Sequence, residues 1–499
     1  MSTIKTIKAL KDGGVKEPRV IIMGAGMSGI LMGINLLKAG LTNFSIYEKR
    51  STIGGTWREN TYPGAECDIP SALYSYSFEH NPAWEYKWSG QEQIFSYQKH
   101  VAAKHALYEH IEFDKTVVSA EFDEREKRWL VTTADGALFL CQHLVSAVGQ
   151  LHRPFTPPIE GREDYQGILF HSAKWDHSAD LTGKKVAVIG NAASALQFIP
   201  QIAPQVAQLD VYQRSANWVL PKQDRPYKPW EQWLSDKVPV ITKLYRFKLW
   251  CRGDGLLYQI MRGNPLVTRI ARWASMRNLK KIIKDPELQR KLTPDYPIGA
   301  KRILFSDDYY HAIARDNVHL ETAGIARITE TGITTSENKH TDYDAIIFGT
   351  GFSTNPFLAP MRISGIGGQL LSDHWSGGAQ AYLGMTTHGF PNLFMLYGPN
   401  TNLGHNSIIL MIEAQTTYII NCVTQMDREG WSSIDVKESV EQQYNREIQQ
   451  RLGEMSFSKV DHSWYMDNGK ITNNWAGSTW EYRRKTRSVV WQDFDKSAA

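Results

Sequence analysis

A glycine-rich turn between a strand-like run and a helix-like run constrains this chain more than any other feature. Gly24, Gly26 and Gly29 follow the apolar run Val-Ile-Ile-Met and open a second apolar run. The first glycine allows a tight turn, the second lets the backbone approach a pyrophosphate, and the third permits close packing of helix on strand. Glu48 ends the next strand-like run, where an acid accepts hydrogen bonds from an adenosine ribose. The segment predicts a dinucleotide site at a helix N-terminus.

The same segment also resembles a membrane-spanning helix, because residues 20–37 carry no charge. Its four glycines and its strand-like beginning argue against a span. We therefore predict a buried strand, a turn and a buried helix here.

The glycine pattern returns later in the chain in a weaker form. Gly190 is kept, but Ala192 and Ala195 occupy the second and third glycine positions. Alanine at the second position brings a methyl group toward the pyrophosphate, so we expect looser or slightly displaced binding.

The strand after this second turn ends without an acid. Gln213 and Arg214 stand where the first unit has Glu48. A neutral residue does not repel a 2′-phosphate, and a guanidinium binds one through paired hydrogen bonds. We therefore predict FAD at the first site and NADPH at the second, and we assign Ser194 and Ser215 to the second site. The alternative for Arg214 is a solvated surface cation.

Two such units in 499 residues predict an α/β protein with two Rossmann-like dinucleotide-binding domains and a helical insertion. The FAD-binding domain comprises residues 1–150 and 341–499, and the NADP-binding domain comprises residues 151–224 and 291–340. We place the return to the first domain at residues 343–352, a buried strand with a glycine turn of the kind that faces a flavin.

The helical insertion covers residues 225–290. Its apolar residues recur at helical spacing and alternate with basic and aromatic side chains. We expect a helical subdomain packed over the cofactor cleft. The alternative is an amphipathic surface for a membrane or a partner protein.

Composition excludes several classes of function. The net charge is only +4, which argues against a nucleic-acid binder. The four cysteines (Cys67, Cys141, Cys251 and Cys422) are far apart, which excludes a C-x-x-C redox centre and a cysteine zinc site. No histidine–carboxylate group has metal-ligand spacing, so we predict no metal. Unpaired cysteines and the lack of a signal-peptide core lead us to expect a cytoplasmic protein.

Two motifs point to a known family. Residues 165–176 resemble the F-x-G-x-x-x-H-x-x-x-W-P/D signature of type I Baeyer–Villiger monooxygenases, with Tyr165 in place of Phe as the one departure. Residues 54–68 are similar to that family's second motif, A/G-G-x-W-x4-F/Y-P-G/M-x3-D, without a mismatch. The Trp175-Asp176 pair favours this branch over the related monooxygenases that oxidise nitrogen and sulfur. The resemblance spans roughly residues 18–490.

The resemblance implies a reaction and its residues. NADPH would reduce FAD, dioxygen would add to give a C4a-peroxyflavin, and a ketone would become an ester or lactone. The family's active-site arginine is expected at Arg302, with Asp68 orienting it and limiting its net charge. Lys301 would join Arg214 at the 2′-phosphate. The alternatives are a surface salt bridge for Arg302, a turn cap for Asp68 and a solvated side chain for Lys301.

The remaining motif residues have supporting roles in this scheme. Gly55, Thr56 and Trp57 are expected beside the flavin ring, although Trp57 is also suited to a core. His171 and Trp175 fall in the connection between the two domains, where we expect them to couple NADPH docking to domain closure. Nothing in the sequence makes His171 an acid or a base.

Other functions stay open at this stage. One is a sulfur or amine oxygenase that uses a hydroperoxyflavin. Another is a flavin-bound sensor or partner-binding protein with a decayed NADPH site, which Ala192 suggests. A disulfide reductase on the same scaffold is disfavoured because no cysteine pair can relay electrons. The sequence does not distinguish linear, cyclic, aryl and steroid ketones.

Overall fold

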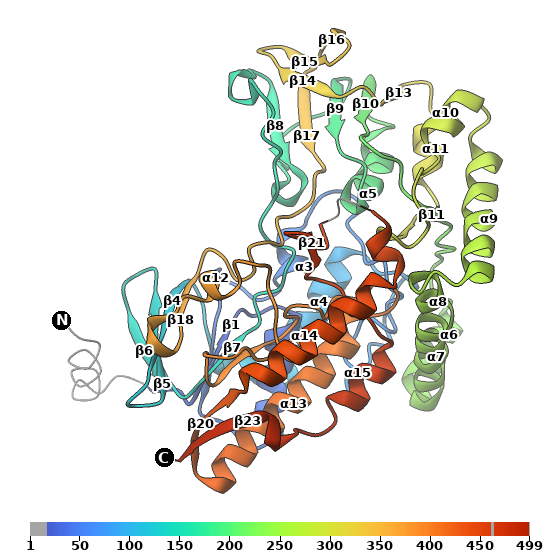
Figure 1. The fold of residues 1–499 in the computed structure, drawn as a ribbon. Coiled ribbons are helices and arrows are strands. Elements are labelled where there is room, and N and C mark those ends of the chain that lie inside the picture. The colour runs from blue at the N-terminus through green and yellow to red at the C-terminus, as the bar shows by residue number, and fades with distance from the viewer. Residues whose placement is uncertain (1–16, 461–463, 499) are drawn as a thin grey trace.

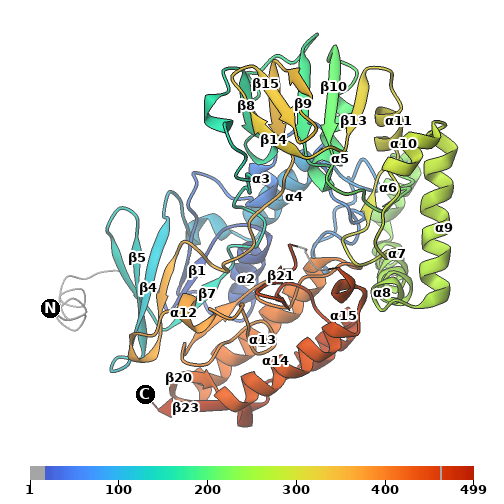
Figure 2. The same cartoon turned by 45° about the horizontal axis from the view of Figure 1, so that its top comes forward.

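The structure, a computed structural model, describes residues 17–460 and 464–498. Figure 1 shows two α/β units, one above the other, with a group of helices beside them. Figure 2 gives a second view, in which the helical group lies to the right of both units. The two predicted α/β units and the helical insertion are confirmed.

The first unit is built on a five-stranded parallel sheet. Every residue of its strands β1, β2 and β7 is buried, as expected for a parallel sheet that is covered on both faces. Helix α2 (Met27–Lys38) follows β1 and contacts α13 (Ile408–Glu429). In sheet order, the strands are β19 (Leu393–Met395), β7 (His143–Ser146), β1 (Val20–Met23), β2 (Phe44–Tyr47) and β3 (Ile111–Glu112).

The uncharged run of residues 20–37 is thus a strand, a turn and most of a helix, and the rejection of a membrane span there is confirmed. Within the described ranges, no helix is both long and apolar enough to cross a bilayer.

The second unit repeats this architecture, with α5 (Ala193–Ile202) following its β9 strand. In sheet order, its parallel strands are β13 (Val318–Glu321), β10 (Gln208–Tyr212), β9 (Lys185–Ile189), β17 (Ala345–Phe348) and β8 (Ile168–His171).

One predicted boundary is wrong. We predicted that the chain returns to the first unit at residues 343–352, but β17 pairs with β8 and β9 in the second sheet. The first sheet is instead completed by β19, next to β7. Strands β7 and β17 are both short, fully buried and followed by a glycine turn, so the local pattern does not reveal which sheet receives them.

Smaller sheets and helices complete the two units. Their bounds are β4 (Val117–Asp123), β5 (Arg128–Thr133), β6 (Leu138–Cys141), β18 (Arg362–Ser364), β14 (Ile325–Ile328), β15 (Gly332–Thr335), β16 (His340–Asp342), β11 (Val219–Leu220), β12 (Leu304–Phe305), β20 (Trp431–Val436), β23 (Phe494–Ala498), β21 (Met466–Asp467), β22 (Lys470–Ile471), α3 (Thr56–Glu59), α4 (Gln91–Lys104), α11 (Tyr309–Ile313), α12 (Leu371–His374), α14 (Glu438–Gly453) and α15 (Thr479–Lys485).

The insertion consists of helices. They are α6 (Pro229–Lys237), α7 (Pro239–Arg252), α8 (Tyr258–Met261), α9 (Pro265–Ile282) and α10 (Pro286–Lys291). Two polar side chains fix them to the first unit. Arg246 donates a hydrogen bond of 2.8 Å to Ser75 Oγ, and Asp254 accepts one of 2.8 Å from Thr479 Oγ1.

A buried carboxyl group in α14 predicts a pH-dependent stability. Glu441 is 2% exposed, and burial raises its pKa to about 7, although Thr387 and the N–H of His388 donate hydrogen bonds to it. The unfolded chain loses this proton near pH 4.3. The folded protein therefore binds more protons than the unfolded chain between about pH 4.3 and pH 7, and this contribution to stability is lost as the pH rises.

We expect this group to lower the free energy of unfolding by about 2.5 kcal/mol between about pH 5 and pH 8. Thermal unfolding midpoints measured across that range should fall less steeply in Glu441→Gln. The exposed Glu438 on the same helix gives a matched control, Glu438→Gln, which should keep the parent's slope. If the thermal midpoints of the parent and of Glu441→Gln fall equally steeply with pH, the raised pKa of Glu441 is contradicted.

Candidate active site

The two glycine-rich turns lie where the sequence predicts them, each between the middle strand of its sheet and the helix that follows that strand. Gly24 follows β1 at φ +102° and Gly190 follows β9 at φ +108°, both in the left-handed region that favours glycine. A Cβ on Gly24 would lie 2.9 Å from the carbonyl oxygen of Ala147. Each turn leads into a helix N-terminus whose first N–H groups have no acceptor within the helix.

The second glycine position has the same backbone in both units. Gly26 has φ −82° and ψ −168°, and Ala192 has φ −81° and ψ −165°. Alanine therefore causes no strain at position 192. Its methyl group is exposed at the wall of a large cavity between the two turns.

The third glycine position is accommodated differently in the two units. A Cβ on Gly29 would lie 1.9 Å from the carbonyl oxygen of Gly24 and 3.6 Å from Cβ of Ala147. In the second unit, Ala195 replaces Gly29 and Gly349 replaces Ala147. A Cβ on Gly349 would lie 3.0 Å from that of Ala195. The second unit thus has its methyl group on the helix and none on the facing end of the strand, the reverse of the first unit.

A single cavity of about 1340 Å³ brings both turns together. No residue of the helical insertion lines it, so the expectation that these helices cover the cofactor cleft is wrong; they pack beside it, on both units. Gly29, His171 and Trp175 lie outside the lining. The predicted residues that line it are Gly24, Gly26, Glu48, Gly55, Thr56, Trp57, Asp68, Gly190, Ala192, Ser194, Arg214, Ser215, Lys301 and Arg302.

Glu48 is buried at the end of β2 and is already held by its neighbours. Its Oε2 accepts a hydrogen bond of 2.9 Å from the N–H of Ala25, inside the first glycine turn. Its Oε1 accepts one of 3.0 Å from Arg58 and one of 3.1 Å from the N–H of Arg50. Arg58 also lines the cavity, but it occupies a variable position of the second motif, where no sequence signal singles it out.

The second motif folds back onto the first glycine turn. The N–H of Gly54 donates a hydrogen bond of 2.9 Å to the carbonyl of Ala25, and a Cβ on Gly26 would lie 3.6 Å from Cα of Gly55. Trp57, in α3, is buried and donates its indole N–H to the hydroxyl of Tyr74 at 3.1 Å. Trp57 therefore packs in a core and also lines the cavity.

Arg302 and Asp68 meet at the cavity wall although they lie far apart in the sequence. Arg302 Nε donates a hydrogen bond of 2.7 Å to Asp68 Oδ2, and a second guanidinium nitrogen contacts the same oxygen. Burial disfavours the charge on Arg302, but Asp68 and then Tyr465 outweigh burial, so the pKa of the guanidinium stays above its ordinary value. The result is a permanent cation with a fixed orientation. Tyr465 and Tyr397, which also interact with Arg302, carry no motif that the sequence analysis recognised.

Two cations lie together beyond the end of β10. Lys301 Nζ donates a hydrogen bond of 3.3 Å to Ser215 Oγ. Burial lowers the pKa of Lys301, and the charge of nearby Arg214 lowers it further. Gln213 is buried instead of presenting a charge, and its Oε1 accepts a hydrogen bond of 2.8 Å from Asn191. This end of the cavity is therefore positively charged.

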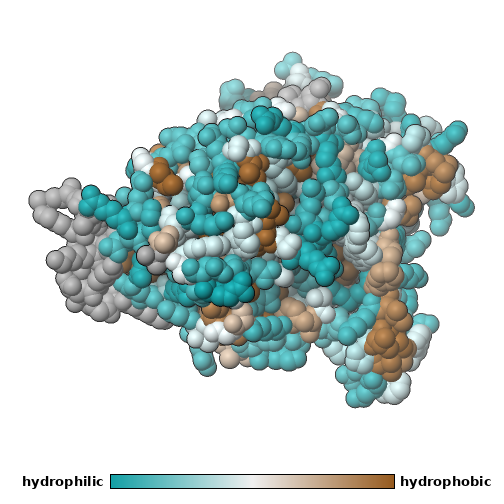
Figure 3. Space-filling view, turned by 60° about the horizontal axis from the view of Figure 1, so that its bottom comes forward, coloured by the Kyte–Doolittle hydropathy of each residue, from teal (hydrophilic) through white to brown (hydrophobic). Residues whose placement is uncertain are grey.

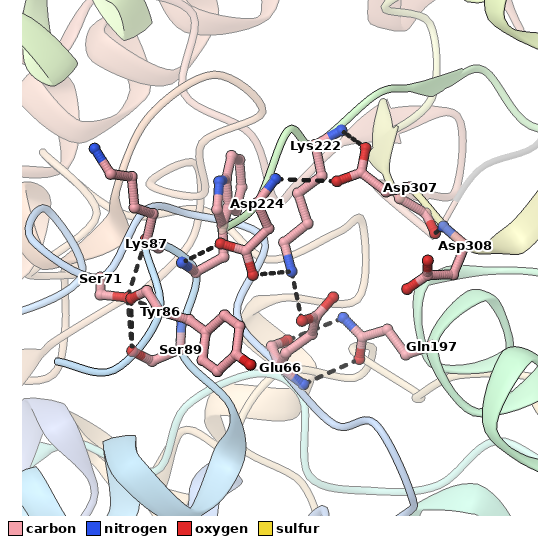
Figure 4. Close-up of polar contacts among 12 residues, drawn as sticks. Glu66, Ser71, Tyr86, Lys87, Ser89, Gln197, Lys222, Asp224, Asp307 and Asp308 are labelled. Carbon is pink, nitrogen blue, oxygen red and sulfur yellow. Dashed lines mark hydrogen bonds and ion pairs between the residues drawn. The ribbon is translucent and has the colours of Figure 1, made fainter. Parts of the chain in front are cut away.

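An ion pair between a buried lysine and a partly exposed glutamate, which the sequence does not reveal, supports the loop that carries Asp68. Figure 4 shows Lys222 directed at Glu66, just before Asp68 in the chain, and the Lys222 side chain is only 4% exposed. Gln197 of α5 donates a hydrogen bond of 2.9 Å to the Glu66 carbonyl, and Asp307 accepts one of 2.9 Å from the Lys222 N–H. These contacts join the loop to the second unit. Glu66 and Lys222 come from distant parts of the sequence and form no local pattern.

The two segments that connect the units run beside each other, and His171 lies against one of them. The N–H of Phe155 donates a hydrogen bond of 2.9 Å to Gly351, and the N–H of Ser353 donates one of 2.8 Å to Arg153. The ring of His171, at the end of β8, lies 6.3 Å from the ring of Phe352. His171 Nδ1 accepts a hydrogen bond from the N–H of Ala173, so this nitrogen is already occupied.

Trp175 belongs to a row of aromatic rings that passes from one unit to the other. Its ring lies 5.0 Å from that of Phe170 and 5.3 Å from that of Phe198 in α5. Phe198 lies 6.1 Å from Tyr62 of the second motif, whose hydroxyl donates a hydrogen bond of 2.8 Å to Gln197. Trp175 therefore contacts the second unit, which in turn contacts the loop carrying Asp68.

Comparisons with known proteins agree with this geometry. A family model described as pyridine nucleotide-disulphide oxidoreductase matches residues 21–235. A solved steroid monooxygenase bound to NADP is 30% identical, with a TM-score of 0.87 over 96% of this chain and 99% of that one. OTEMO, solved with FAD and NADP, is 26% identical, with a TM-score of 0.87 over 97% of this chain and 100% of that one.

A curated relative gives the family. The Baeyer–Villiger monooxygenase of Pseudomonas aeruginosa is 42% identical over 490 residues, which cover 96% of this chain and 90% of the relative. With this identity along nearly the whole length of both chains, and with both family motifs at the cavity or its supports, the chain belongs to the type I Baeyer–Villiger monooxygenases.

Proposed function

We propose that the protein inserts one oxygen atom of O2 next to the carbonyl of a ketone, giving an ester or lactone, with FAD and NADPH as cofactors. The observation that carries this proposal is the Arg302–Asp68 pair at the wall of a cavity that both glycine turns also line. Its partners are a small ketone and O2, with no nucleic acid. We place the protein in the cytoplasm, where its four free cysteines stay reduced.

The residues of the first turn fit FAD. Close backbone packing around Gly24 and Gly29 leaves no space for side chains there, and the N-terminal N–H groups of α2 suit a diphosphate. Glu48 is proposed to contact the ribose of FAD from the cavity wall. Gly55, Thr56 and Trp57 line the same cavity. FAD, when bound, supplies the chemistry that passes electrons from NADPH to O2.

Arg302 is the proposed catalytic residue and Asp68 its positioning residue. The fixed guanidinium stabilises negative charge that develops on oxygen during the reaction. Asp68 holds the guanidinium plane and keeps the pair close to neutral, which reduces the cost of burying it. Apolar side chains, among them Leu403 and Ile409, also line the cavity. A sulfur or amine oxygenase has less need of such a fixed cation.

Arg214, Ser215 and Lys301 are proposed to bind the 2′-phosphate of NADPH, with Gly190, Ala192 and Ser194 beside its diphosphate. Arg214→Ala should raise the KM for NADPH about 30-fold, because a paired, charge-assisted hydrogen bond is lost. The KM for NADH, which lacks this phosphate, should stay close to that of the parent. Steady-state kinetics with both nucleotides measure the difference.

Arg214→Lys is the matched control for this prediction. It keeps the charge but loses the planar pair of donors, so its KM for NADPH should lie between those of the parent and the alanine variant. An equal rise of KM for NADPH and NADH in Arg214→Ala would refute the role in 2′-phosphate binding.

His171 and Trp175 are proposed to couple the two units. His171 lies against the paired connecting segments, and Trp175 reaches the Asp68 loop through Phe198 and Tyr62. Docking of NADPH on the second unit is thereby transmitted to the loop that orients Arg302. Neither side chain lines the cavity, which agrees with a supporting role.

Two measurements test the proposed function. Anaerobic mixing of the flavin-loaded protein with NADPH should bleach the flavin absorbance, whereas a sensor with a decayed nucleotide site would not respond. Aerobic incubation with linear, cyclic, aryl and steroid ketones should then give an ester or lactone identified by mass spectrometry. Consumption of NADPH without such a product from any ketone, but with oxidation of a sulfide or amine, would overturn the assignment.

A further inference from the structure

The helical insertion presents an apolar stripe that nothing in the described part of the chain covers. In α7, Val240, Leu244 and Phe247 are 56%, 63% and 60% exposed, although side chains of this kind are usually buried. Spacings of four and three positions place them on one face of the helix. Cys251, also exposed, continues the same stripe one turn later.

Helix α9 repeats this arrangement. Leu266, Ile270 and Trp273 have the same spacing as the stripe of α7 and are also more than half exposed. Trp230 and Trp233 add two exposed indoles from α6. Figure 3 shows brown side chains gathered on the right-hand side of the molecule, the side on which Figure 1 draws these helices. We call these eight side chains of α6, α7 and α9 the apolar stripe: Trp230, Trp233, Val240, Leu244, Phe247, Leu266, Ile270 and Trp273.

The charge around the apolar stripe is strongly positive. Residues 229–284 contain 12 Lys and Arg against 3 Asp and Glu, a formal charge of +9, whereas the whole chain carries +4. Helical geometry places Lys243 and Lys248 on opposite sides of the α7 stripe, and Arg277 extends the α9 stripe. The guanidinium of Arg277 lies 5.1 Å from the Trp273 ring.

The three acids of this segment do not offset the positive surface. Glu231 forms two hydrogen bonds of 2.7 Å with Arg225, and Asp236 pairs with Lys237 at 2.8 Å. Asp254 faces the first unit, where it accepts hydrogen bonds from Thr479 and Asn406. The exposed surface is therefore apolar side chains bordered by cations.

The helices hold this surface in a fixed orientation. The faces opposite the stripe carry Arg246 and Ser275, both buried and both hydrogen-bonded, to Ser75 and to the carbonyl of Val219. The stripe is thus the outer face of a rigid element and does not depend on a movement of the chain.

We propose that the apolar stripe docks the protein on an anionic lipid bilayer, with α6, α7 and α9 lying along its surface. Exposed Trp, Phe and Leu bordered by Lys and Arg are the pattern of helices that insert their apolar face at the headgroup level. Each basic side chain near an anionic leaflet adds to the attraction. A second copy of the chain is a poor occupant, because a two-fold contact would bring two surfaces of like charge together. The proposal is independent of the oxidation chemistry.

Vesicle co-sedimentation of the flavin-loaded protein tests this proposal. We expect binding to vesicles that contain about 30% phosphatidylglycerol, much weaker binding to pure phosphatidylcholine, and release by about 0.5 M NaCl. Leu244→Gln/Phe247→Gln should lower the affinity for anionic vesicles about 10-fold or more, because two inserting side chains are lost. Lys243→Gln/Lys248→Gln should lower it as well and reduce its dependence on salt.

The matched control removes exposed apolar side chains elsewhere. Tyr108→Gln/Val490→Gln should bind vesicles as the parent does, since both residues are exposed but lie outside the helical insertion. Unchanged flavin absorbance and thermal midpoint establish that each variant is folded. Equal binding of the parent to both kinds of vesicle, or to neither, overturns the proposal. So does a dimer in sedimentation velocity that Leu244→Gln/Phe247→Gln converts to a monomer, which would make the stripe an interface between copies.

Discussion

Arg302→Ala should form ester about 1000-fold more slowly than the parent, while NADPH still reduces its flavin. The guanidinium is a cation that Asp68 holds at the cavity wall, and the loss of one group that stabilises a developing oxyanion typically costs this much. The hydride transfer from NADPH does not depend on that charge. Product formation measured by gas chromatography and anaerobic stopped-flow absorbance separate the two steps.

Arg302→Lys is the control for the loss of charge. It keeps a cation but loses the hydrogen bond of 2.7 Å from Nε to Asp68, so we expect a rate between those of the parent and the alanine variant. Asp68→Asn should leave the guanidinium in place but less well oriented, with a smaller loss. Ester formation at the parent's rate by Arg302→Ala would show that the cation has no part in catalysis.

Gly29→Ala should yield a protein that lacks bound flavin and is destabilised by more than about 3 kcal/mol. The added Cβ would lie 1.9 Å from the carbonyl oxygen of Gly24, and this oxygen belongs to backbone that cannot rotate away. Helix α2 must then move away from the turn that is expected to hold the diphosphate. The ratio of flavin to protein absorbance and the thermal midpoint of the purified variant measure both effects.

Gly26→Ala is the matched control within the same turn. Its Cβ would meet no atom nearer than 3.6 Å, and Ala192 shows that alanine adopts the same backbone angles in the second unit. We expect the flavin-free Gly26→Ala variant to be as thermally stable as the flavin-free parent. Its affinity for FAD should be lower than that of the parent. A fully flavin-loaded Gly29→Ala would refute the role of close packing at this position.

What the sequence predicted well are the features that a short run of residues determines. Gly24 is recognisable because its turn needs a positive φ, and Gly29 because its helix needs a small residue there. The residue after the next strand, Glu48 or Arg214, follows the turn at a similar separation in the sequence. Gly24, Glu48 and Arg214 line the cavity. Gly29 lies outside the lining and packs against the backbone of Gly24.

What the sequence did not predict depends on residues far apart in the chain. The Glu66–Lys222 ion pair forms only after both units have folded, so its two halves look like ordinary surface charges. The place of β17 was wrong because a buried apolar strand carries no mark of the sheet that it joins. The helices of the insertion were predicted, but whether their apolar faces point inward or outward depends on tertiary packing.

The paired connecting segments have a consequence for how such a protein can arise. Because residues 153–155 run beside residues 351–353, the second unit starts and ends at almost the same point. Strands β7 and β19 are neighbours in the first sheet although the whole second unit lies between them in the chain. A domain whose ends meet can enter one loop of another without disturbing the host's sheet. The architecture is therefore that of one domain inserted into a loop of another. The two coding segments can diverge under separate selection.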